Sequence, residues 1–103
     1  MIKLIKAEWL YDKEIRLSFS DGSYGVMDFS PLLSKKTAMT LPLESSQYFC
    51  RFFLELGALC WPNGFELSPG SLHEKLDKAG QLVRFDAEPT KENVPTTLRL
   101  RSG

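Results

Sequence analysis

The 103-residue sequence contains few of the residues on which metal sites and redox sites depend. It has one histidine, His73, and two cysteines, Cys50 and Cys60, whose separation matches neither a Cys-x-x-Cys redox pair nor a zinc-ligand spacing. Each cysteine lies in an apolar stretch, so we expect both to be reduced and packed in the core. A single histidine leaves a zinc site short of its usual ligands. We therefore expect no metal and no cofactor.

Long hydrophobic runs and an excess of charge are also absent. No run approaches the roughly 20 apolar residues that cross a bilayer, and the early lysines of residues 1–6 do not fit a signal peptide. Thirteen basic and thirteen acidic residues give a formal net charge of zero, which removes the positive field that dedicated nucleic-acid-binding proteins use. The sequence predicts a cytoplasmic protein that binds no membrane and has a neutral partner.

What is present is a pattern of short strands. Residues 15–20 alternate apolar and polar side chains and stop at Asp21-Gly22, a two-residue loop typical of a type I′ hairpin turn. This loop predicts a register with Phe19 opposite Tyr24, Leu17 opposite Val26 and Ile15 opposite Asp28.

A preceding strand over residues 5–9 would return through a three-residue loop, 11–13. This loop predicts Trp9 opposite Ile15, Ala7 opposite Leu17 and Ile5 opposite Phe19. Adjacent Leu4 and Ile5 break the alternation, which indicates a β-bulge or an edge strand.

Serine followed by proline marks two predicted helix starts, because serine caps a helix and proline at the first position loses no hydrogen bond. Ser30-Pro31 begins a short turn, and Ser68-Pro69 begins the clearest helix, which ends at Gly80. Its narrow apolar stripe, Leu72 and Leu76, suits a helix lying across one sheet face. Residues 51–56, 58–61 and 65–67 predict a second small meander. The fold class is α+β, with antiparallel hairpins or meanders and a few short helices packed on one face.

Residues 1–80 are predicted to form a single compact domain, and residues 81–103 a C-terminal extension. Pro89 and Pro95 give the extension the composition of an arm or linker. Leu98 and Leu100, which alternate with arginines, predict an edge strand as the alternative, within this molecule or on a neighbour.

Two motifs carry a resemblance to a known family. They are residues 19–22 followed by 28–33 (Phe-Ser-Asp-Gly, then Asp-Phe-Ser-Pro-Leu-Leu), and residues 61–69 (Trp-Pro-Asn-Gly-Phe-Glu-Leu-Ser-Pro) with Leu72. Their order resembles the small bacterial proteins called domain of unknown function 2442, from about Ile2 to about Leu76. The resemblance implies a compact α+β domain with no established activity, cofactor or catalytic residue. Members tend to be encoded beside other small proteins, some toxin–antitoxin-like, which implies a partner-binding role. The family usually has Asp where this chain has Glu66 and a small residue where it has Phe65.

Most of the motif residues have a local structural reason. We assign to turns and helix caps Asp21, Gly22, Ser30, Pro31, Pro62, Gly64, Ser68 and Pro69. As residues that contact a partner we predict Trp9, Trp61, Asn63, Leu98 and Leu100, although Trp61 also suits a small core.

A catalytic constellation is not evident. His73 lies beside Glu74 and one turn from Asp77, a pattern typical of a solvated helix face. If the domain is catalytic, Asp28 and Glu66 at strand ends are the alternative carboxylate pair.

A nucleic-acid role would use scattered basic residues, Lys3, Lys6, Arg84, Arg99 and Arg101, with Trp9 or Tyr24 for stacking. We favour a non-enzymatic module that binds another protein or its own copy. The alternative is a small nucleic-acid-associated regulator.

Overall fold

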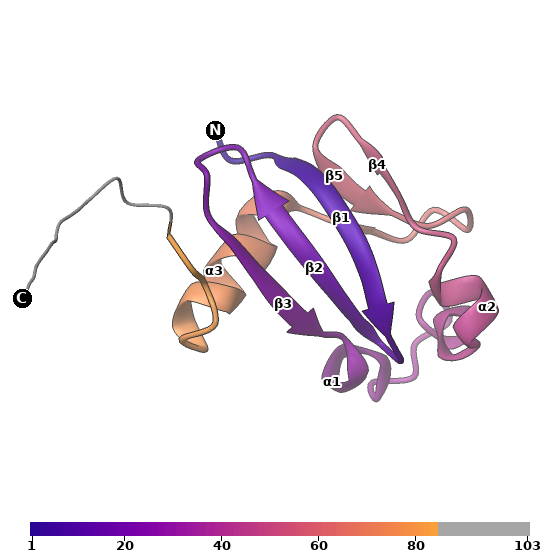
Figure 1. Cartoon of the computed structure of the whole chain (residues 1–103). Coiled ribbons are helices and arrows are strands. Elements are labelled where there is room, and N and C mark those ends of the chain that lie inside the picture. Colours follow the sequence, from indigo (N-terminus) through magenta and orange to yellow (C-terminus); the bar gives the residue numbers. More distant parts are fainter. Residues whose placement is uncertain (85–103) are drawn as a thin grey trace, which may run out of the picture.

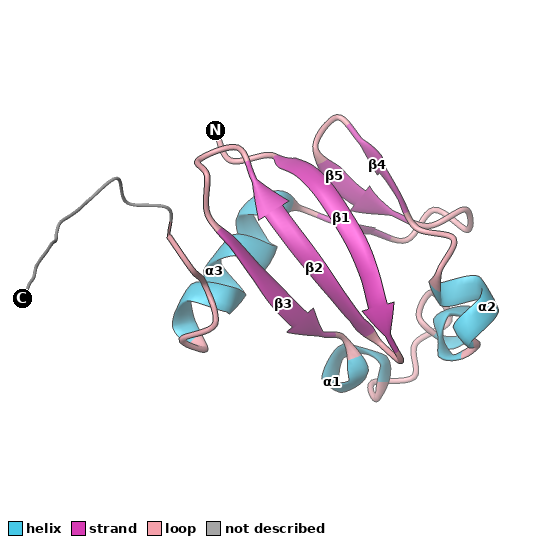
Figure 2. Cartoon of the chain, in the orientation of Figure 1, coloured by secondary structure: helices cyan, strands magenta, loops and turns pink. Residues whose placement is uncertain are grey.

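The computed structural model describes residues 1–84, which form two small antiparallel sheets and short helices (Figures 1 and 2). The first sheet has the order β1-β2-β3 and the second β4-β5-β6. The α+β prediction is confirmed. The elements are β1 (Leu4–Tyr11), β2 (Glu14–Phe19), β3 (Tyr24–Asp28), α1 (Ser30–Leu33), η1 (Leu41–Glu44), α2 (Ser46–Phe49), β4 (Phe53–Glu55), β5 (Ala58–Cys60), β6 (Glu66–Leu67) and α3 (Pro69–Lys78). Over this part of the chain no helix has the length and apolar character to span a membrane.

The register between β2 and β3 differs by one residue from the sequence prediction. The hairpin loop contains three residues, because the Phe19 amide donates to the Ser23 carbonyl across it at 2.8 Å. Gly22 takes the left-handed conformation with φ of 89°, as in a type I turn followed by a bulge. Asp21 accepts a hydrogen bond from the Ser23 amide at 2.9 Å, which favours this longer loop over the two-residue turn. The prediction of a two-residue turn at Asp21-Gly22 is therefore wrong.

The shift exchanges the two faces of β3, because a one-residue slip turns every side chain to the opposite side. Leu17 pairs with Gly25 and Ile15 with Met27, whereas Val26 pairs with Arg16 on the outer face. Gly25 is buried beneath α3. A Cβ atom there would lie 2.7 Å from the Gln81 carbonyl oxygen, so glycine permits the close approach of the chain after α3.

The pairing of β1 with β2 follows the prediction through the middle of the strand. Trp9 lies opposite Ile15 and Ala7 opposite Leu17. The register shifts after Leu4, so Leu4 takes the place predicted for Ile5 opposite Phe19. The predicted bulge is confirmed. A second shift follows Trp9, which leaves a two-residue connection between β1 and β2 where a three-residue loop was expected.

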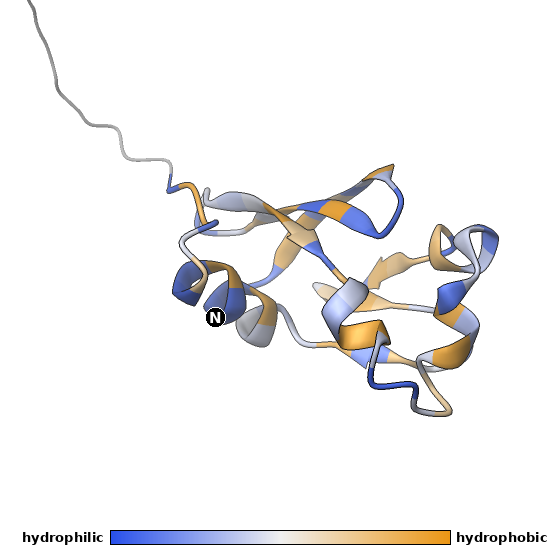
Figure 3. Ribbon diagram, turned by 90° about the horizontal axis from the view of Figure 1, so that it is seen from below, coloured by the Kyte–Doolittle hydropathy of each residue, from blue (hydrophilic) through white to orange (hydrophobic). Residues whose placement is uncertain are grey.

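The second meander is confirmed, and it joins the first sheet where the Leu4 amide donates to the Gly57 carbonyl at 2.9 Å. Strand β5 is buried at all three positions, whereas β2 alternates buried apolar and polar residues, the period expected of a strand with one buried face. Figure 3 shows hydrophobic bands along the ribbon of the described chain. The core residues come from both sheets and all three α-helices: Leu4, Ile15, Leu17, Phe19, Phe29, Leu33, Leu43, Phe49, Leu59, Trp61, Leu72 and Leu76.

Helix α3 has the predicted ends and the predicted buried stripe. The Ser68 hydroxyl accepts a hydrogen bond from the Ser71 amide at 3.2 Å, and Gly80 has φ of 71° after the last turn. Leu72 and Leu76 are buried. The helix packs across one face of the first sheet (Figure 1).

Two local predictions need correction. Helix α1 begins at Ser30 itself, and no side chain caps it from the preceding position. The Asp28 carboxylate instead accepts a hydrogen bond from the Ser30 amide at 2.9 Å.

Of the two cysteines expected in the core, Cys60 is buried but Cys50, just beyond α2, is exposed. Burial raises the pKa of the Cys60 thiol, which keeps it protonated and unreactive.

Candidate functional site

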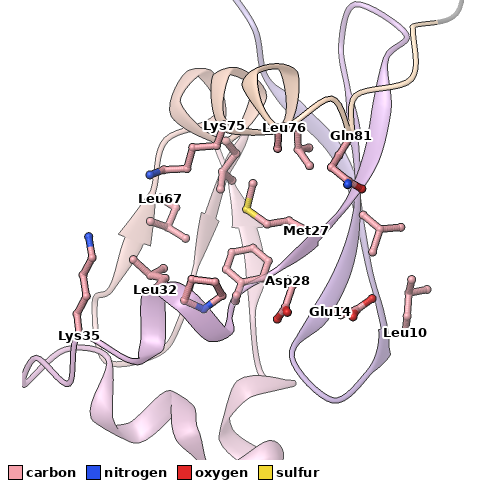
Figure 4. Close-up of a pocket in the computed structure, with 15 residues that line it drawn as sticks. Leu10, Glu14, Met27, Asp28, Leu32, Lys35, Leu67, Lys75, Leu76 and Gln81 are labelled. Atoms are coloured by element: carbon pink, nitrogen blue, oxygen red, sulfur yellow. The ribbon is translucent and has the colours of Figure 1, made fainter.

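A groove of about 730 Å³ lies beside β3 (Figure 4). Its volume is in the range of pockets that bind small ligands or peptide side chains. Helix α3 forms one wall, α1 lies at the far end, and β3 runs along the opposite side. We call this feature the β3 groove. Its lining residues are Leu10, Glu14, Val26, Met27, Asp28, Phe29, Pro31, Leu32, Lys35, Leu67, Leu72, Lys75, Leu76, Ala79 and Gln81.

The floor of the β3 groove is apolar. Phe29, Leu72 and Leu76 are buried members of the core, while Leu32 and Met27 are partly buried and pack against it. A partly buried apolar floor that opens to solvent can gain further burial from a bound side chain, at about 25 cal/mol for each Å² of apolar surface covered. The groove is therefore suited to an aliphatic side chain.

Charged groups of opposite sign stand on opposite sides of this floor. Glu14 and Asp28 are direct cross-strand partners on the outer face of the sheet. Lys35 and Lys75 lie on the other side, near α1 and along α3 (Figure 4). Within residues 1–84 none of these four side chains takes part in an ion pair. The Asp28 carboxylate accepts a hydrogen bond from the Ser30 amide, and the four charges can still orient a bound segment.

The backbone of β3 also presents hydrogen-bonding groups toward the groove. Tyr24 exchanges two hydrogen bonds with Val83, at 2.9 and 2.7 Å, on the side of β3 away from β2. In an antiparallel ladder the outward-pointing residues recur at every second position, so the amide and carbonyl of Val26 point the same way. No residue within 1–84 hydrogen-bonds to either group of Val26. Within residues 1–84 the Val26 backbone therefore has no hydrogen-bond partner on the side of β3 that faces away from β2, beside the groove.

Trp61, predicted as a contact to a partner, is not on the surface. Its side chain is only 1% exposed, and its indole Nε1 donates to the Phe49 carbonyl at 2.9 Å. The ring lies 5.7 to 6.3 Å from four phenylalanine rings, including Phe29 and Phe65. The prediction of a surface role is wrong, because a small core needs this large apolar side chain.

Asn63, the second predicted contact in the same motif, is used within the turn. Its side-chain amide donates to the Met39 carbonyl at 3.0 Å, and its side-chain oxygen accepts from the Phe65 amide at 3.1 Å. Gly64 has φ of 93°, which glycine adopts without strain. Pro62 and Gly64 are both exposed at this turn. Residues 61–65 therefore hold β5 and β6 in place.

The remaining predicted contacts are dispersed. Trp9 is 45% exposed on β1, where its Nε1 donates to the Asp12 carbonyl at 2.9 Å, and it is not among the residues that line the β3 groove. Leu98 and Leu100 lie outside the described residues. Of the alternative carboxylate pair, Asp28 lines the groove and Glu66 does not, so the structure does not bring them together at one pocket.

His73 is not the solvated residue that the sequence suggested. Its Nε2 lies 3.0 Å from an Asp21 carboxylate oxygen, and its ring meets Phe19 edge-on with centroids 5.0 Å apart. The other Asp21 oxygen accepts from the buried Ser23 hydroxyl. The aspartate stands between serine and histidine, which is the wrong order for a nucleophile activated by a base. The cluster fastens the β2–β3 loop to α3.

The Asp21 carboxylate makes the domain sensitive to acid. Hydrogen bonds from Ser23, chiefly its hydroxyl, lower the pKa of Asp21 from 3.8 to about 2. Because the folded pKa lies below the unfolded value, this carboxylate stabilises the fold above about pH 4, and the contribution is lost as the pH falls toward 2. We expect Asp21→Asn to be less stable than the native chain at pH 7, and the difference between them to shrink between pH 4 and pH 2.

Urea unfolding at a series of pH values measures this difference. The other carboxylates titrate in both proteins and cancel in the comparison. A gap in the free energy of unfolding that stays constant from pH 7 to pH 2 would show that Asp21 does not hold the loop through its charge.

Two basic residues expected to serve a nucleic-acid role stand beside carboxylates. Lys6 Nζ lies 3.4 Å from Glu8, and Arg84 lies 3.3 Å from Asp77. Neighbouring carboxylates weaken the positive potential that phosphates require. Lys3 is exposed, and Arg99 and Arg101 lie outside the described residues. No group of His, Cys, Asp or Glu within residues 1–84 is arranged to hold a metal ion.

Sequence reasoning missed most residues of the β3 groove. The register predicted for β3 placed Val26 on the buried face and Met27 on the outer face, whereas the structure has them the other way round. A three-residue loop between β2 and β3 would have placed Gly25 and Met27 on the inner face, and Asp21-Gly22 is compatible with such a loop. Lys35 and Lys75 gave no signal, because isolated lysines on helices and loops are common.

Comparisons with known proteins identify one relationship. The family model described as "Protein of unknown function (DUF2442)" matches residues 5–77. This span includes every strand except the first residue of β1, and all of α3 except Lys78. No curated protein matches the chain, and no solved structure matches it.

Proposed function

The chain belongs to the DUF2442 family, whose function is unknown, and from that premise we propose that it is a non-enzymatic module that binds an extended segment of another protein in the β3 groove. The observation that carries the proposal is the open edge at Val26 lying beside an apolar groove of about 730 Å³. An added strand would hydrogen-bond to the edge and place alternate side chains in the groove.

The rim charges favour a protein segment over a nucleic acid. Glu14 and Asp28 stand on the sheet side of the groove, where they would repel a phosphate backbone. A peptide can satisfy both rims at once, with basic side chains toward the carboxylates and acidic side chains toward Lys35 and Lys75.

The apolar floor defines which side chains the segment inserts. Met27, Leu32 and Leu67 are partly buried and reach the groove, so they would contact an inserted leucine, isoleucine or methionine. Burial of such an anchor in a pocket supplies a large share of the binding energy at protein interfaces. We expect the affinity to depend on these contacts and to persist at moderate salt concentration.

Selection from a random peptide library displayed on phage, against the full chain, tests the proposal. We expect extended peptides with alternate aliphatic residues to be selected. Their affinity should fall by about tenfold or more in Leu32→Glu, because a carboxylate in an apolar pocket loses its hydration. The matched control is Leu41→Glu, since Leu41 is 49% exposed and does not line the groove. Equal affinities for both variants, with both folded by circular dichroism, would contradict a site in the β3 groove.

A further inference from the structure

The free backbone groups and the charges of β3 restrict which segment can bind beside it. We propose that the bound segment has a lysine or arginine opposite Asp28 and, next to it in sequence, an aliphatic residue opposite Met27. The partner is then a protein with an exposed strand that is basic on one face and aliphatic on the other. This inference rests on the proposed function, because it specifies the chemistry of the segment bound in the β3 groove.

The first support is the direction in which the backbone of β3 points. The Phe29 amide donates toward β2, to the Lys13 carbonyl, at 2.9 Å. Hydrogen-bonded pairs recur at every second residue of an antiparallel ladder, so the amides and carbonyls of Val26 and Asp28 point away from β2. No backbone group within residues 1–84 hydrogen-bonds to them. A bound strand can therefore pair with both residues.

The second support is that the other end of the same edge is already occupied. Val83 exchanges two hydrogen bonds with Tyr24 in an antiparallel bridge. Leu82, the residue before Val83, is partly buried and packs against the core. A bound segment therefore pairs with β3 over residues 26–28 alone, and three of its residues face defined positions of the strand.

The third support is the difference between the two faces at these positions. Residues directly opposite each other in a sheet have their side chains on the same face. Met27 is partly buried, packs against the core and lines the β3 groove, so the side chain opposite it enters the groove beside the apolar floor. The side chains opposite Val26 and Asp28 lie on the outer face of the sheet. The inner position therefore favours an aliphatic residue.

The fourth support is the pair of carboxylates on the outer face. Asp28 lies opposite Glu14, and like charges directly opposite each other destabilise a sheet. Neither has an ion-pair partner within residues 1–84, and Figure 4 shows both on the same side of the groove. A cation opposite Asp28 relieves this repulsion. Arg16 lies opposite Val26 on the same face, which disfavours a second basic residue there.

A double-mutant cycle with a phage-selected peptide tests the inference. We expect the selected peptides to have a lysine or arginine next to the inserted aliphatic residue. Replacement of that basic residue by glutamine should lower the affinity for the native chain by about threefold or more at low salt. The same replacement should have no effect on the affinity for Asp28→Asn. Asparagine keeps a side-chain oxygen that can accept from the Ser30 amide, so the start of α1 is preserved.

The matched control is Asp12→Asn, which removes the same charge from the β1–β2 turn. Asp12 is exposed and does not line the β3 groove, and its φ of 52° is a conformation that asparagine also adopts. In this protein the glutamine peptide should lose as much affinity as it does with the native chain. If Asp28→Asn does not fold, Glu14→Gln takes its place in the cycle, because it removes the other carboxylate.

Selected peptides without a basic residue would overturn the inference, and so would an equal effect of glutamine in the native chain and in Asp28→Asn. The Leu32→Glu variant separates this failure from that of the proposed function. If Leu32→Glu loses the peptide while glutamine changes nothing in the native chain, the β3 groove binds peptides without selecting a basic residue. If Leu32→Glu binds as tightly as the native chain, or no peptide is selected, the proposed function fails and the inference fails with it.

Discussion

Trp61→Ala is expected to lower the free energy of unfolding by about 3 to 5 kcal/mol, the cost of removing a large aromatic side chain from a packed core. Trp61 is 1% exposed and lies among the rings of Phe29, Phe49, Phe52 and Phe65. Since small domains are stable by only about 5 to 15 kcal/mol, this one change removes a large fraction of the total. Urea unfolding followed by circular dichroism measures the loss.

A matched substitution separates the ring from the indole nitrogen. Trp61→Phe keeps an aromatic ring but removes the Nε1 donor that bonds to the Phe49 carbonyl at 2.9 Å. We expect a smaller loss, about 1 to 3 kcal/mol, because a buried carbonyl is left without its partner. If Trp61→Ala unfolds at the same urea concentration as the native chain, Trp61 does not stabilise the core. That result would contradict its core role and favour the surface contact predicted from the sequence.

Gly25→Ala is expected to destabilise the fold by about 1 to 3 kcal/mol, the usual cost of overpacking a core. The added Cβ would lie 2.7 Å from the Gln81 carbonyl oxygen and 3.2 Å from a Leu76 methyl group. Backbone cannot move aside as a flexible side chain does, so α3 and the chain after it must shift away from β3. The β3 groove, whose wall includes Leu76 and Gln81, would change shape with them.

Gly70 provides the control for this substitution. It lies in the first turn of α3, and no neighbouring atom lies within 4 Å of the position that an added methyl group would take. Alanine has a higher helix propensity than glycine by up to about 1 kcal/mol, so Gly70→Ala should be neutral or stabilising. Thermal unfolding of both variants measures the contrast, and a Gly25→Ala protein as stable as Gly70→Ala would show that α3 does not pack against β3 as described.

Much of the fold follows from local sequence signals. Ser68-Pro69 and Gly80 define the ends of α3 correctly, because capping and termination depend on residues within one turn. The bulge near Leu4 was also visible in the sequence, as a break in the strand alternation. These features require no knowledge of distant contacts.

The β2–β3 register could not be obtained in this way. Asp21-Gly22 is compatible with both a two-residue and a three-residue loop, and the choice depends on interactions of the loop with the rest of the molecule. Asp21 bonds to Ser23 on one side and lies 3.0 Å from His73 of α3 on the other. That second contact joins residues 52 positions apart in the sequence, which alternation of apolar and polar residues cannot reveal.

The candidate site was missed for the same reason. Trp61 and Asn63 attract attention as large or polar residues beside a turn, but their contacts are with Phe49, Met39 and Phe65 inside the domain. The β3 groove instead combines an ordinary valine on a sheet edge with aliphatic residues from α1, β6 and α3. Only the tertiary arrangement places them together.

Peptide binding in the β3 groove depends most on strand addition at Val26, and the affinity of Val26→Pro for a phage-selected peptide measures it most directly. Proline removes the outward amide but leaves the β2–β3 hydrogen bonds, since the Val26 amide points away from β2. We predict that the affinity falls by about tenfold or more while β2 and β3 keep their amide protection. Native affinity in a folded Val26→Pro protein would contradict strand addition at the β3 edge.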